Sequence, residues 1–310
     1  MPSSLLYKTQ TRWLFHSHIK LKLSIFYDDS IFDELFETLE EVNSKYNSYT
    51  KDSYFDLINQ RAGRFVSTDG HTVALLKKLI TISDDLDGEF DITVMPLIRL
   101  WGFYKENNHL IPSTEDIQAV IENVDYSNIS IQENGNQVRV GVKQEIITGA
   151  FVKAFAVDRL VENMKSIGIT DAIINAGGST IYAINNESHP SWPIQVDEAR
   201  KGGNPLFQLR ISNECYSTSS SENTYLEIEG KRYSHIISPK TGYPSENKQV
   251  GIVSRDAVVG DAISTGLFNF DKDSFAKKMR SLSTKYEVEG FIVDKNGEIV
   301  FSDNFEKYIV

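Results

Sequence analysis

The stretch ITGAFVKAFAVDRLVENMKSIGITDAIINAGGSTIY, from Ile147 to Tyr182, decides the fold around it. Its first half spaces apolar side chains three to four residues apart, which predicts a helix, and Gly168 stands where a glycine cap would end that helix. Residues 172–174 then read as a short strand. Residues 175–178, Asn-Ala-Gly-Gly, form a turn in which missing side chains let a ligand or another backbone approach closely. The pattern predicts a helix, a strand and a tight glycine turn in succession.

The start of this helix has the features of an anion site. Thr148 is placed to cap the helix, Gly149 and Ala150 leave N–H groups open, and Lys153 adds a positive charge one turn further on. The positive end of the helix dipole favours negative charge at the same place. The residues therefore predict a phosphate-binding site, although a core helix followed by a tight turn explains them equally well.

A loop near residue 240 carries polar groups suited to chemistry. The segment YSHIISPKTGYP, Tyr233–Pro244, places His235, Lys240 and Thr241 between prolines and glycine. A lone histidine in a loop usually means little, but the ordinary pKa of histidine, about 6.5, suits a proton acceptor at neutral pH.

A third segment, VVGDAISTGLF, places Asp261 and Thr265 four residues apart. On a helix two such residues share one face, so their oxygens point the same way. Pairs of this kind more often cap or solvate a helix than bind a metal. The spacing alone leaves both interpretations open.

Five motifs together resemble the FAD:protein FMN transferases, the ApbE family. In chain order they are FDITVMPLIRLWGF, GAFVKAFAVDR, NAGG, SHIISPKTGYP and DAIST. They keep the family's order from about Tyr49 to Phe268, so the resemblance covers most of the chain. It implies Mg²⁺-dependent transfer of FMN from FAD, the substrate, to a threonine hydroxyl of an acceptor flavoprotein, with release of AMP.

The resemblance also implies roles for individual residues. The metal ligands would be the side chains of Asp261 and Thr265 and the backbone carbonyl of Ala150. His235 would accept the proton of the incoming threonine hydroxyl, with Asp261 as the second catalytic residue. The residues expected to bind the flavin nucleotide are Tyr49, Asp91, Thr93, Lys153, Asp158, Gly177, Gly178, Lys240 and Thr241.

Several positions depart from the family pattern. Relatives often carry Asp-Leu-Gly-Gly where this chain has residues 147–150, Ile-Thr-Gly-Ala, so a carboxylate is missing. The other departures are Ala154 and Ser220, which replace glycines, and Ser179 and Ser238, which replace aspartates. Because Asp261, Thr265 and His235 are retained, we expect an active enzyme with an altered pocket.

Two other functions fit the same residues. An FAD pyrophosphatase would use water in place of threonine at the same metal site, and only its products would differ. A non-catalytic FAD-binding protein is favoured by the missing carboxylates and disfavoured by the retained metal pair and histidine. A nicotinamide dehydrogenase fits least, since no G-x-G-x-x-G follows a strand.

Composition bounds these alternatives. With 310 residues, 40% of them hydrophobic, we expect one flavin-transferase domain over residues 1–310, or two closely packed lobes. The formal charge of −11 argues against partners such as nucleic acid or an anionic membrane. A phosphorylated ligand would therefore need local help from a metal ion, a helix end or well-placed lysines.

The lone cysteine and the N-terminal segment bear on the compartment. Cys215 excludes an intrachain disulfide and is expected to be a small buried residue. The first 26 residues contain no uninterrupted apolar h-region and no lipoprotein-type cysteine. This predicts a cytoplasmic protein as the sequence is written. A chain trimmed of an export signal would look the same and would be extracytoplasmic.

Strands in hairpins interleaved with helices favour a mixed α+β fold with mostly antiparallel sheets. Ser30 with Asp33, and Ser113 with Asp116, have the spacing of capping boxes at helix starts. Pro96 breaks the pattern of an apolar run, and Trp101-Gly102-Phe103 offers bulk for a pocket wall, although a buried aromatic cluster explains Trp101 alone equally well. Further strands are expected at 18–27, 191–199 and 205–212, helices at 30–46, 72–82, 113–124 and 273–282, and hairpin turns at 134–135, 229–230 and 296–297.

Overall fold

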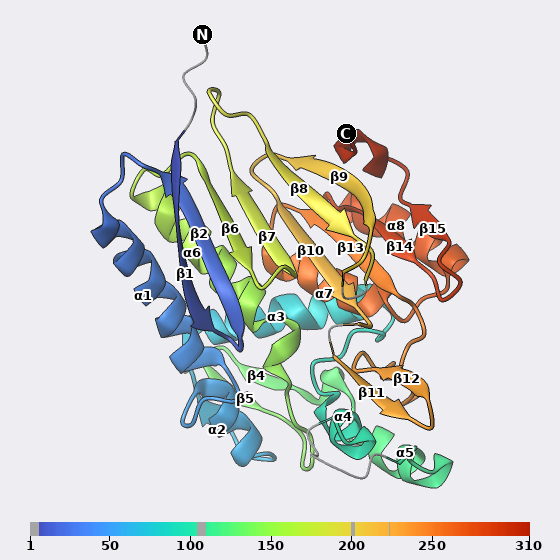
Figure 1. The fold of residues 1–310 in the computed structure, drawn as a ribbon. Helices are drawn as coiled ribbons and strands as arrows, with labels where there is room; N and C mark the ends of the chain where they lie inside the picture. The colour runs from blue at the N-terminus through green and yellow to red at the C-terminus, as the bar shows by residue number, and fades with distance from the viewer. Residues whose placement is uncertain (1–5, 104–109, 200–201, 223) are drawn as a thin grey trace.

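A large antiparallel sheet forms the centre of the protein (Figure 1). The computed structural model describes residues 6–103, 110–199, 202–222 and 224–310. Within these residues the sheet has eight strands in the order β1-β2-β6-β7-β10-β13-β14-β15. The strands are β1 (Tyr7–Leu14), β2 (Ser17–Ser24), β6 (Ala172–Ala176), β7 (Thr180–Ile184), β10 (Cys215–Ser220), β13 (Gln249–Ser254), β14 (Glu289–Val293) and β15 (Ile299–Phe301). The predicted mixed α+β class is confirmed.

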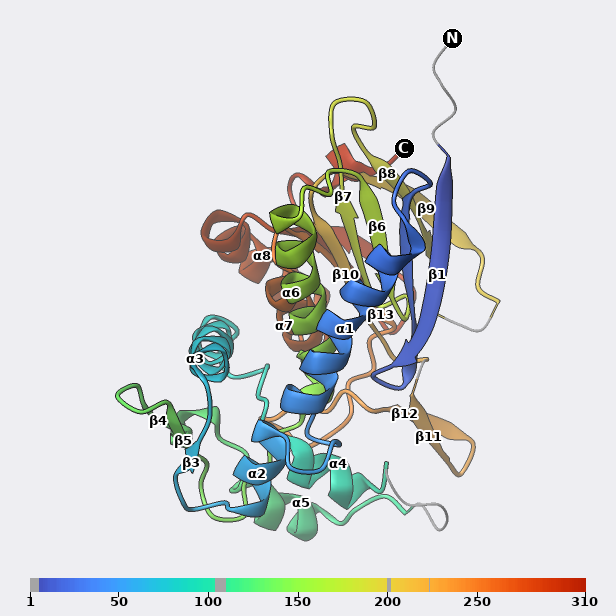
Figure 2. The ribbon, with the colours of Figure 1, turned by 90° about the vertical axis from the view of Figure 1, so that its left-hand side faces the viewer.

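Helices cover one face of this sheet, and a hairpin covers the other (Figure 2). The alternation of side chains along a strand serves both faces: Tyr182 and Ile184 of β7 join the core under the helices, while Ile181 and Ala183 join the second core. The helices are α1 (Asp29–Tyr46), α6 (Val152–Ser166), α7 (Ala257–Leu267) and α8 (Lys272–Tyr286). The second core lies beneath β8 (Trp192–Asp197), β9 (Pro205–Ile211) and the 3₁₀ turn η3 (Phe305–Tyr308).

The remaining elements gather at one end of the sheet, at the bottom of Figure 1. They include a small three-stranded sheet, β3-β5-β4, and a separate hairpin, β11-β12. Their bounds are α2 (Tyr54–Gln60), β3 (Val66–Ser67), α3 (Gly70–Asp85), α4 (Met95–Trp101), α5 (Thr114–Ile121), η1 (Tyr126–Asn128), β4 (Ser130–Gln132), β5 (Gln137–Arg139), η2 (Thr148–Ala150), β11 (Tyr225–Ile228) and β12 (Lys231–Ser234).

Most expected elements are present with shifted ends. The three predicted hairpins form, and Ser113 caps α5 by accepting a hydrogen bond from the Asp116 N–H. The capping box predicted for Ser30 and Asp33 was wrong, because α1 begins after Asp28 and Ser30 lies inside the helix. Cys215 is buried and free, as expected.

The expected start of α6 was also wrong. Residues Thr148–Ala150 form the 3₁₀ turn η2, and the helix begins only at Val152 without a side-chain cap. The Thr148 hydroxyl is used elsewhere, since it accepts a hydrogen bond from the Ser48 N–H at 3.0 Å. Thr148 therefore joins η2 to the segment after α1.

The structure assigns separate roles to Pro96 and to the segment from Trp101 to Phe103. Pro96 occupies the first turn of α4, where a missing N–H costs nothing, so it starts a helix. Trp101 is 1% exposed, and its Nε1 donates to the Gly242 carbonyl at 2.8 Å. It belongs to a buried aromatic cluster with Tyr233 and Tyr243, which was the alternative for Trp101, whereas Phe103 of the same segment lines the large cavity described below.

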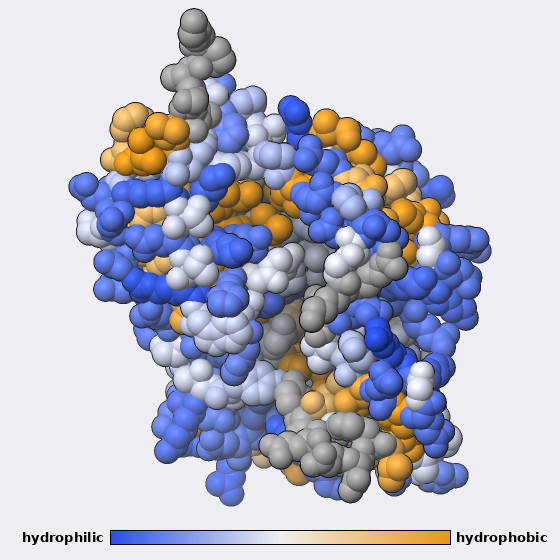
Figure 3. Space-filling model, viewed as in Figure 1, coloured by the Kyte–Doolittle hydropathy of each residue, from blue (hydrophilic) through white to orange (hydrophobic). Residues whose placement is uncertain are grey.

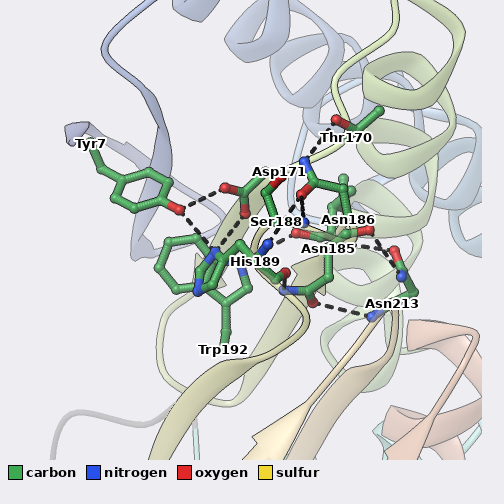
Figure 4. Close-up of polar contacts among 10 residues, drawn as sticks. Tyr7, Thr170, Asp171, Asn185, Asn186, Ser188, His189, Trp192 and Asn213 are labelled. Atoms are coloured by element: carbon green, nitrogen blue, oxygen red, sulfur yellow. Dashed lines mark hydrogen bonds and ion pairs between the residues drawn. The ribbon is translucent and has the colours of Figure 1, made fainter. Parts of the chain in front are cut away.

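A polar network closes the end of the sheet far from the lower elements (Figure 4). The Tyr7 hydroxyl donates to Asp171 at 2.6 Å, and His189 Nδ1 lies 2.9 Å from the same carboxylate. The His189 ring packs against Trp192 with centroids 4.4 Å apart. The network ties the edge strand β1 to the chain between β7 and β8. His189 therefore has a structural role.

The surface seen in Figure 3 is predominantly hydrophilic, with apolar side chains in separate patches across its upper part and at its lower right. Among the described residues, no helix combines the length and the apolar character needed to cross a lipid bilayer.

Candidate active site

A cavity of about 780 Å³ lies where the ends of the central strands meet the lower elements. This volume is in the range of cavities that hold cofactors or substrates. It is lined by residues from widely separated parts of the chain. Eight of the predicted site residues are among them: Tyr49, Asp91, Ala150, Lys153, Gly177, His235, Asp261 and Thr265.

Asp261 is a buried carboxylate on α7. Its residue is 8% exposed, and no hydrogen bond from the described residues reaches its carboxylate. Burial raises the pKa of Asp261 to about 7, and the nearby charge of Lys153 opposes this rise. A carboxylate held in this way lacks a counter-charge, which a bound cation would supply.

Thr265 lies one helical turn after Asp261 and lines the same cavity. Its hydroxyl is 3.3 Å from the Ser219 hydroxyl on β10. Ala150, the last residue of η2, lines the cavity as well. Carboxylate, hydroxyl and carbonyl oxygens form a donor set that fits a hard cation such as Mg²⁺.

A conventional metal cluster is absent from the part of the chain that the structure describes. No group of three or more histidine, cysteine, aspartate or glutamate side chains is found there. A cation bound beside Asp261 would therefore depend on uncharged oxygens and on ligands from a substrate.

His235 follows β12 and is held by the chain after β10. Its Nδ1 lies 2.9 Å from the carbonyl oxygen of Thr224, which can only accept a hydrogen bond. The proton of the neutral ring therefore stays on Nδ1 and leaves Nε2 as an acceptor. Burial lowers the pKa of His235, and the charge of Lys153 lowers it further.

Lys153 and Gly177 bring three chain segments together. The Lys153 ammonium donates to the Ser179 hydroxyl at 2.9 Å, which joins α6 to the β6-β7 turn. Gly177 has φ of +71°, and a Cβ added there would meet the Ser17 hydroxyl at 1.9 Å. Glycine is required here by both the backbone angle and the close approach of the β1-β2 turn.

Asp158 does not line the cavity. Its carboxylate accepts from the N–H groups of Ala257 at 2.8 Å and Val258 at 3.0 Å, at the start of α7. Burial and the neighbouring Asp256 raise the pKa of Asp158. The Asp158 carboxylate therefore stabilises the start of the helix that carries Asp261, and its predicted contact with the flavin nucleotide stays a prediction.

Thr93 also lies outside the cavity lining, although Asp91 is part of it. The Thr93 hydroxyl donates to Asp91 at 2.7 Å and accepts from the Asp125 N–H at 2.9 Å. The second Asp91 oxygen accepts from the Tyr126 N–H. The carboxylate is thus used to shape its own turn, and burial raises its pKa to about 6.

The other predicted residues outside the lining are Gly178, Lys240 and Thr241. Gly178 has φ of +78° and open space around it, so it serves the turn. The Lys240 ammonium lies 3.7 Å from Glu89, and the Thr241 hydroxyl accepts from the Tyr243 N–H. Their predicted contacts with the flavin nucleotide stay predictions.

Ser238, which replaces the family's aspartate, is paired with a carboxylate from another part of the chain. Its hydroxyl donates to Glu89 at 2.9 Å, and Glu89 lines the cavity. Burial raises the pKa of Glu89, while Ser238 and Lys240 oppose that rise. Glu89 therefore supplies a negative charge close to the position where the sequence has lost one.

Three lining residues, Phe15, His16 and Ser17, carry no signal in the sequence. They form the tight turn between β1 and β2, where Phe15 and His16 have φ of 52° and 56°. Turns of this kind normally use Asn-Gly, so Phe-His does not suggest a hairpin. The His16 ring meets the Tyr49 ring edge-on at 6.2 Å, which brings Tyr49 to the mouth of the cavity.

The family model described as the ApbE family matches residues 15–304. This chain belongs to the ApbE family. It is 27% identical over 296 residues to a protein of Klebsiella pneumoniae named FAD:protein FMN transferase, covering 93% of this chain and 90% of that protein. A protein of the same name from Vibrio cholerae is 28% identical over 243 residues, covering 76% and 71%.

Solved structures agree with this membership. The crystal structure of the ApbE protein of Thermotoga maritima matches with a TM-score of 0.89 and 25% identity, over 98% of this chain and 99% of that one. The flavinyl transferase ApbE of Pseudomonas stutzeri has the same fold, with a TM-score of 0.83 at 22% identity, over 98% and 97%.

Proposed function

We propose that this protein transfers FMN from FAD to a hydroxyl group of an acceptor protein and releases AMP. One observation carries the proposal: a single cavity joins the unpaired buried carboxylate of Asp261 to a neutral histidine whose Nε2 is an acceptor. Relatives over most of the chain are named for this activity. The match over residues 15–304 supports one functional unit.

Mg²⁺ is the cation we propose for this site. Asp261, Thr265 and the Ala150 carbonyl would hold it, since all three line the cavity and offer oxygen ligands. A bound Mg²⁺ would neutralise charge on the pyrophosphate of FAD.

His235 is the residue that we propose takes the proton of the acceptor hydroxyl, which we expect to be a threonine. The hydroxyl oxygen bonds to the phosphorus of the FMN half of FAD. The bond from that phosphorus to the bridging oxygen breaks, and the bridging oxygen leaves with AMP. The hydroxyl proton passes to Nε2 of His235, because Nδ1 is occupied by its bond to Thr224.

The remaining lining residues would bind and orient the flavin nucleotide. Lys153 would place a positive charge beside the phosphates, and the bare backbone at Gly177 would allow close approach. Tyr49, half exposed at the mouth of the cavity, would offer an aromatic face to a ring of the substrate.

The proposal is tested by incubating the protein with FAD, Mg²⁺ and candidate acceptor flavoproteins, and then denaturing the mixture. We expect fluorescent flavin to stay attached to the acceptor, and EDTA to prevent the attachment. Free FMN together with AMP would show a pyrophosphatase. Bound but unchanged FAD would show a non-catalytic flavin-binding protein.

A further inference from the structure

A second, smaller cavity lies beside the first and carries an excess of positive charge. It measures about 340 Å³ and lies between the β11-β12 hairpin and the β14-β15 turn. We call its four cationic side chains the basic patch: Lys231, Arg232, Lys248 and Lys295. Only two carboxylates, Glu222 and Glu246, share the lining. In a chain with a formal charge of −11, such a local excess calls for a reason.

The contacts of the patch leave part of its charge unmatched. Glu246 is shared between Lys231 at 3.2 Å and Lys295 at 3.4 Å, and Arg232 is paired with Glu222 at 2.9 Å and with Glu227 at 3.9 Å. No ion pair to Lys248 is found among the described residues, and its ammonium lies beside the turn at Gly297. Lys231, Arg232 and Lys295 keep half or more of their side chains exposed.

The patch and the candidate active site are lined by neighbouring residues of the same two stretches of chain. Ser220 lines the large cavity, and the next residue, Ser221, lines the small one. Ser234 lines the small cavity, and the next residue, His235, lines the large one. A peptide in extended form advances about 3.3 Å per residue. Because Ser234 and His235 are adjacent, we expect an acceptor segment with its hydroxyl at His235 to span the distance to the patch with a few residues.

We propose that the basic patch docks an acidic stretch of the acceptor protein, next to the hydroxyl that receives FMN. This inference rests on the proposed function, because it names the partner of the same site. Opposite charges would steer the acceptor to this positive surface beside His235, because an acidic enzyme repels an acidic segment elsewhere. The exposed ammonium groups would also make docking weaker at high salt.

Reversing two charges of the patch tests the proposal. The patch variant is Lys248→Glu with Lys295→Glu, and the control is Lys143→Glu with Lys277→Glu, two exposed lysines outside both cavities. Both variants change the net charge equally. The probe is a labelled threonine peptide with aspartate and glutamate beside the threonine, and its partner probe has asparagine and glutamine instead. Fluorescence anisotropy measures the dissociation constants.

We expect the acidic peptide to bind the patch variant about tenfold more weakly than the wild type, and the control variant within about twofold. The amide peptide should bind all three proteins equally weakly. Equal binding of the acidic peptide by patch and control variants would overturn the proposal. Lys248→Gln, which removes the positive charge without reversing it, should give a smaller loss in the same direction, and its equality with the wild type would also count against the proposal.

FAD affinity, measured on the same proteins, separates this inference from the proposed function. We expect FAD to bind all variants equally, because the patch lies outside the large cavity. If the patch variant lost FAD affinity, the patch would bind the phosphates of FAD and the docking proposal would be wrong. If the wild type bound no FAD, the proposed function would fail whatever the peptides did.

Discussion

The ring nitrogen Nδ1 of His235 lies 2.9 Å from the carbonyl oxygen of Thr224. Because that oxygen can only accept, one ring nitrogen holds a proton and the other is left to receive one. The same contact fixes the ring against the chain that runs between the two cavities. The direction of proton transfer in the proposed reaction follows from this pair.

His235→Asn should retain the contact with Thr224, since the amide group can donate, and lose the proton acceptor. We expect FAD affinity within about threefold of the wild type and a fall of about 10²–10⁴ in the transfer rate. Calorimetry and single-turnover transfer measure the two quantities. Transfer within about threefold of the wild type would remove His235 from the mechanism.

Lys153→Met should alter the pH dependence of transfer. The lowered pKa of His235 means that the neutral, active ring persists as the pH falls through 6.5, and activity is lost only at lower pH. Removing the Lys153 charge removes one cause of that lowering, so the acidic limb should move to higher pH. A profile of single-turnover rates from pH 5 to 8 measures the shift. An unmoved limb would mean that the Lys153 charge does not act on the ring.

Asp261→Asn should stabilise the metal-free protein at neutral and alkaline pH. The folded-state pKa of about 7 lies above the ordinary value of 3.8, so ionisation of Asp261 costs folding stability as pH rises between these values. The cost is at most about 4 kcal/mol, at about 1.4 kcal/mol for each pKa unit. Urea unfolding in EDTA at pH 5 and pH 8 measures it. A variant no more stable than the wild type at pH 8 would contradict the burial argument.

The same substitution should remove the effect of Mg²⁺. Wild-type protein at pH 8 should gain thermal stability and FAD affinity when Mg²⁺ replaces EDTA, whereas Asp261→Asn should gain neither. Scanning calorimetry and FAD titration report the two gains. Equal gains in both proteins would place the cation elsewhere.

Gly177 and Gly178 offer a matched pair for the close approach at the β6-β7 turn. Both have positive φ, so alanine at either position should cost about 1–2 kcal/mol of stability. Only at Gly177 does the added Cβ also meet Ser17. We expect Gly177→Ala to lose more stability and to weaken FAD binding, and Gly178→Ala to keep its FAD affinity. Equal behaviour of the two variants in unfolding and FAD titration would argue against a close approach at Gly177.

Ser238→Asp, which restores the family residue, should be harmful here because it brings a second carboxylate against Glu89. Adding Glu89→Gln should rescue the loss, since the amide can donate to the new carboxylate. We expect a coupling free energy of about 0.5–3 kcal/mol between the two changes in urea unfolding. Additive effects would show that the two positions are independent.

Several features were readable from the sequence because their causes are local. Asn134-Gly135 and Asn296-Gly297 specify hairpin turns, and the four-residue spacing of Asp261 and Thr265 puts both oxygens on one side of α7. The features that could not be read depend on tertiary contacts. The role of Asp158 depends on the packing of α6 against the start of α7.

The β1-β2 turn is the clearest case of a feature hidden from the sequence. Phe15 and His16 adopt backbone angles that such residues rarely take, and only the surrounding sheet holds them there. The basic patch was equally hidden, since its lysines come from β12, the chain before β13 and the β14-β15 turn.

The most direct test of the central claim is the amount of AMP released by the wild type in the presence and absence of an acceptor flavoprotein, with FAD and Mg²⁺ supplied in both. Our account predicts that AMP appears only with the acceptor and equals the covalently attached flavin one for one, and that free threonine replaces the acceptor very poorly. AMP released at the same rate without any acceptor, or flavin attached to free threonine as fast as to protein, would contradict it.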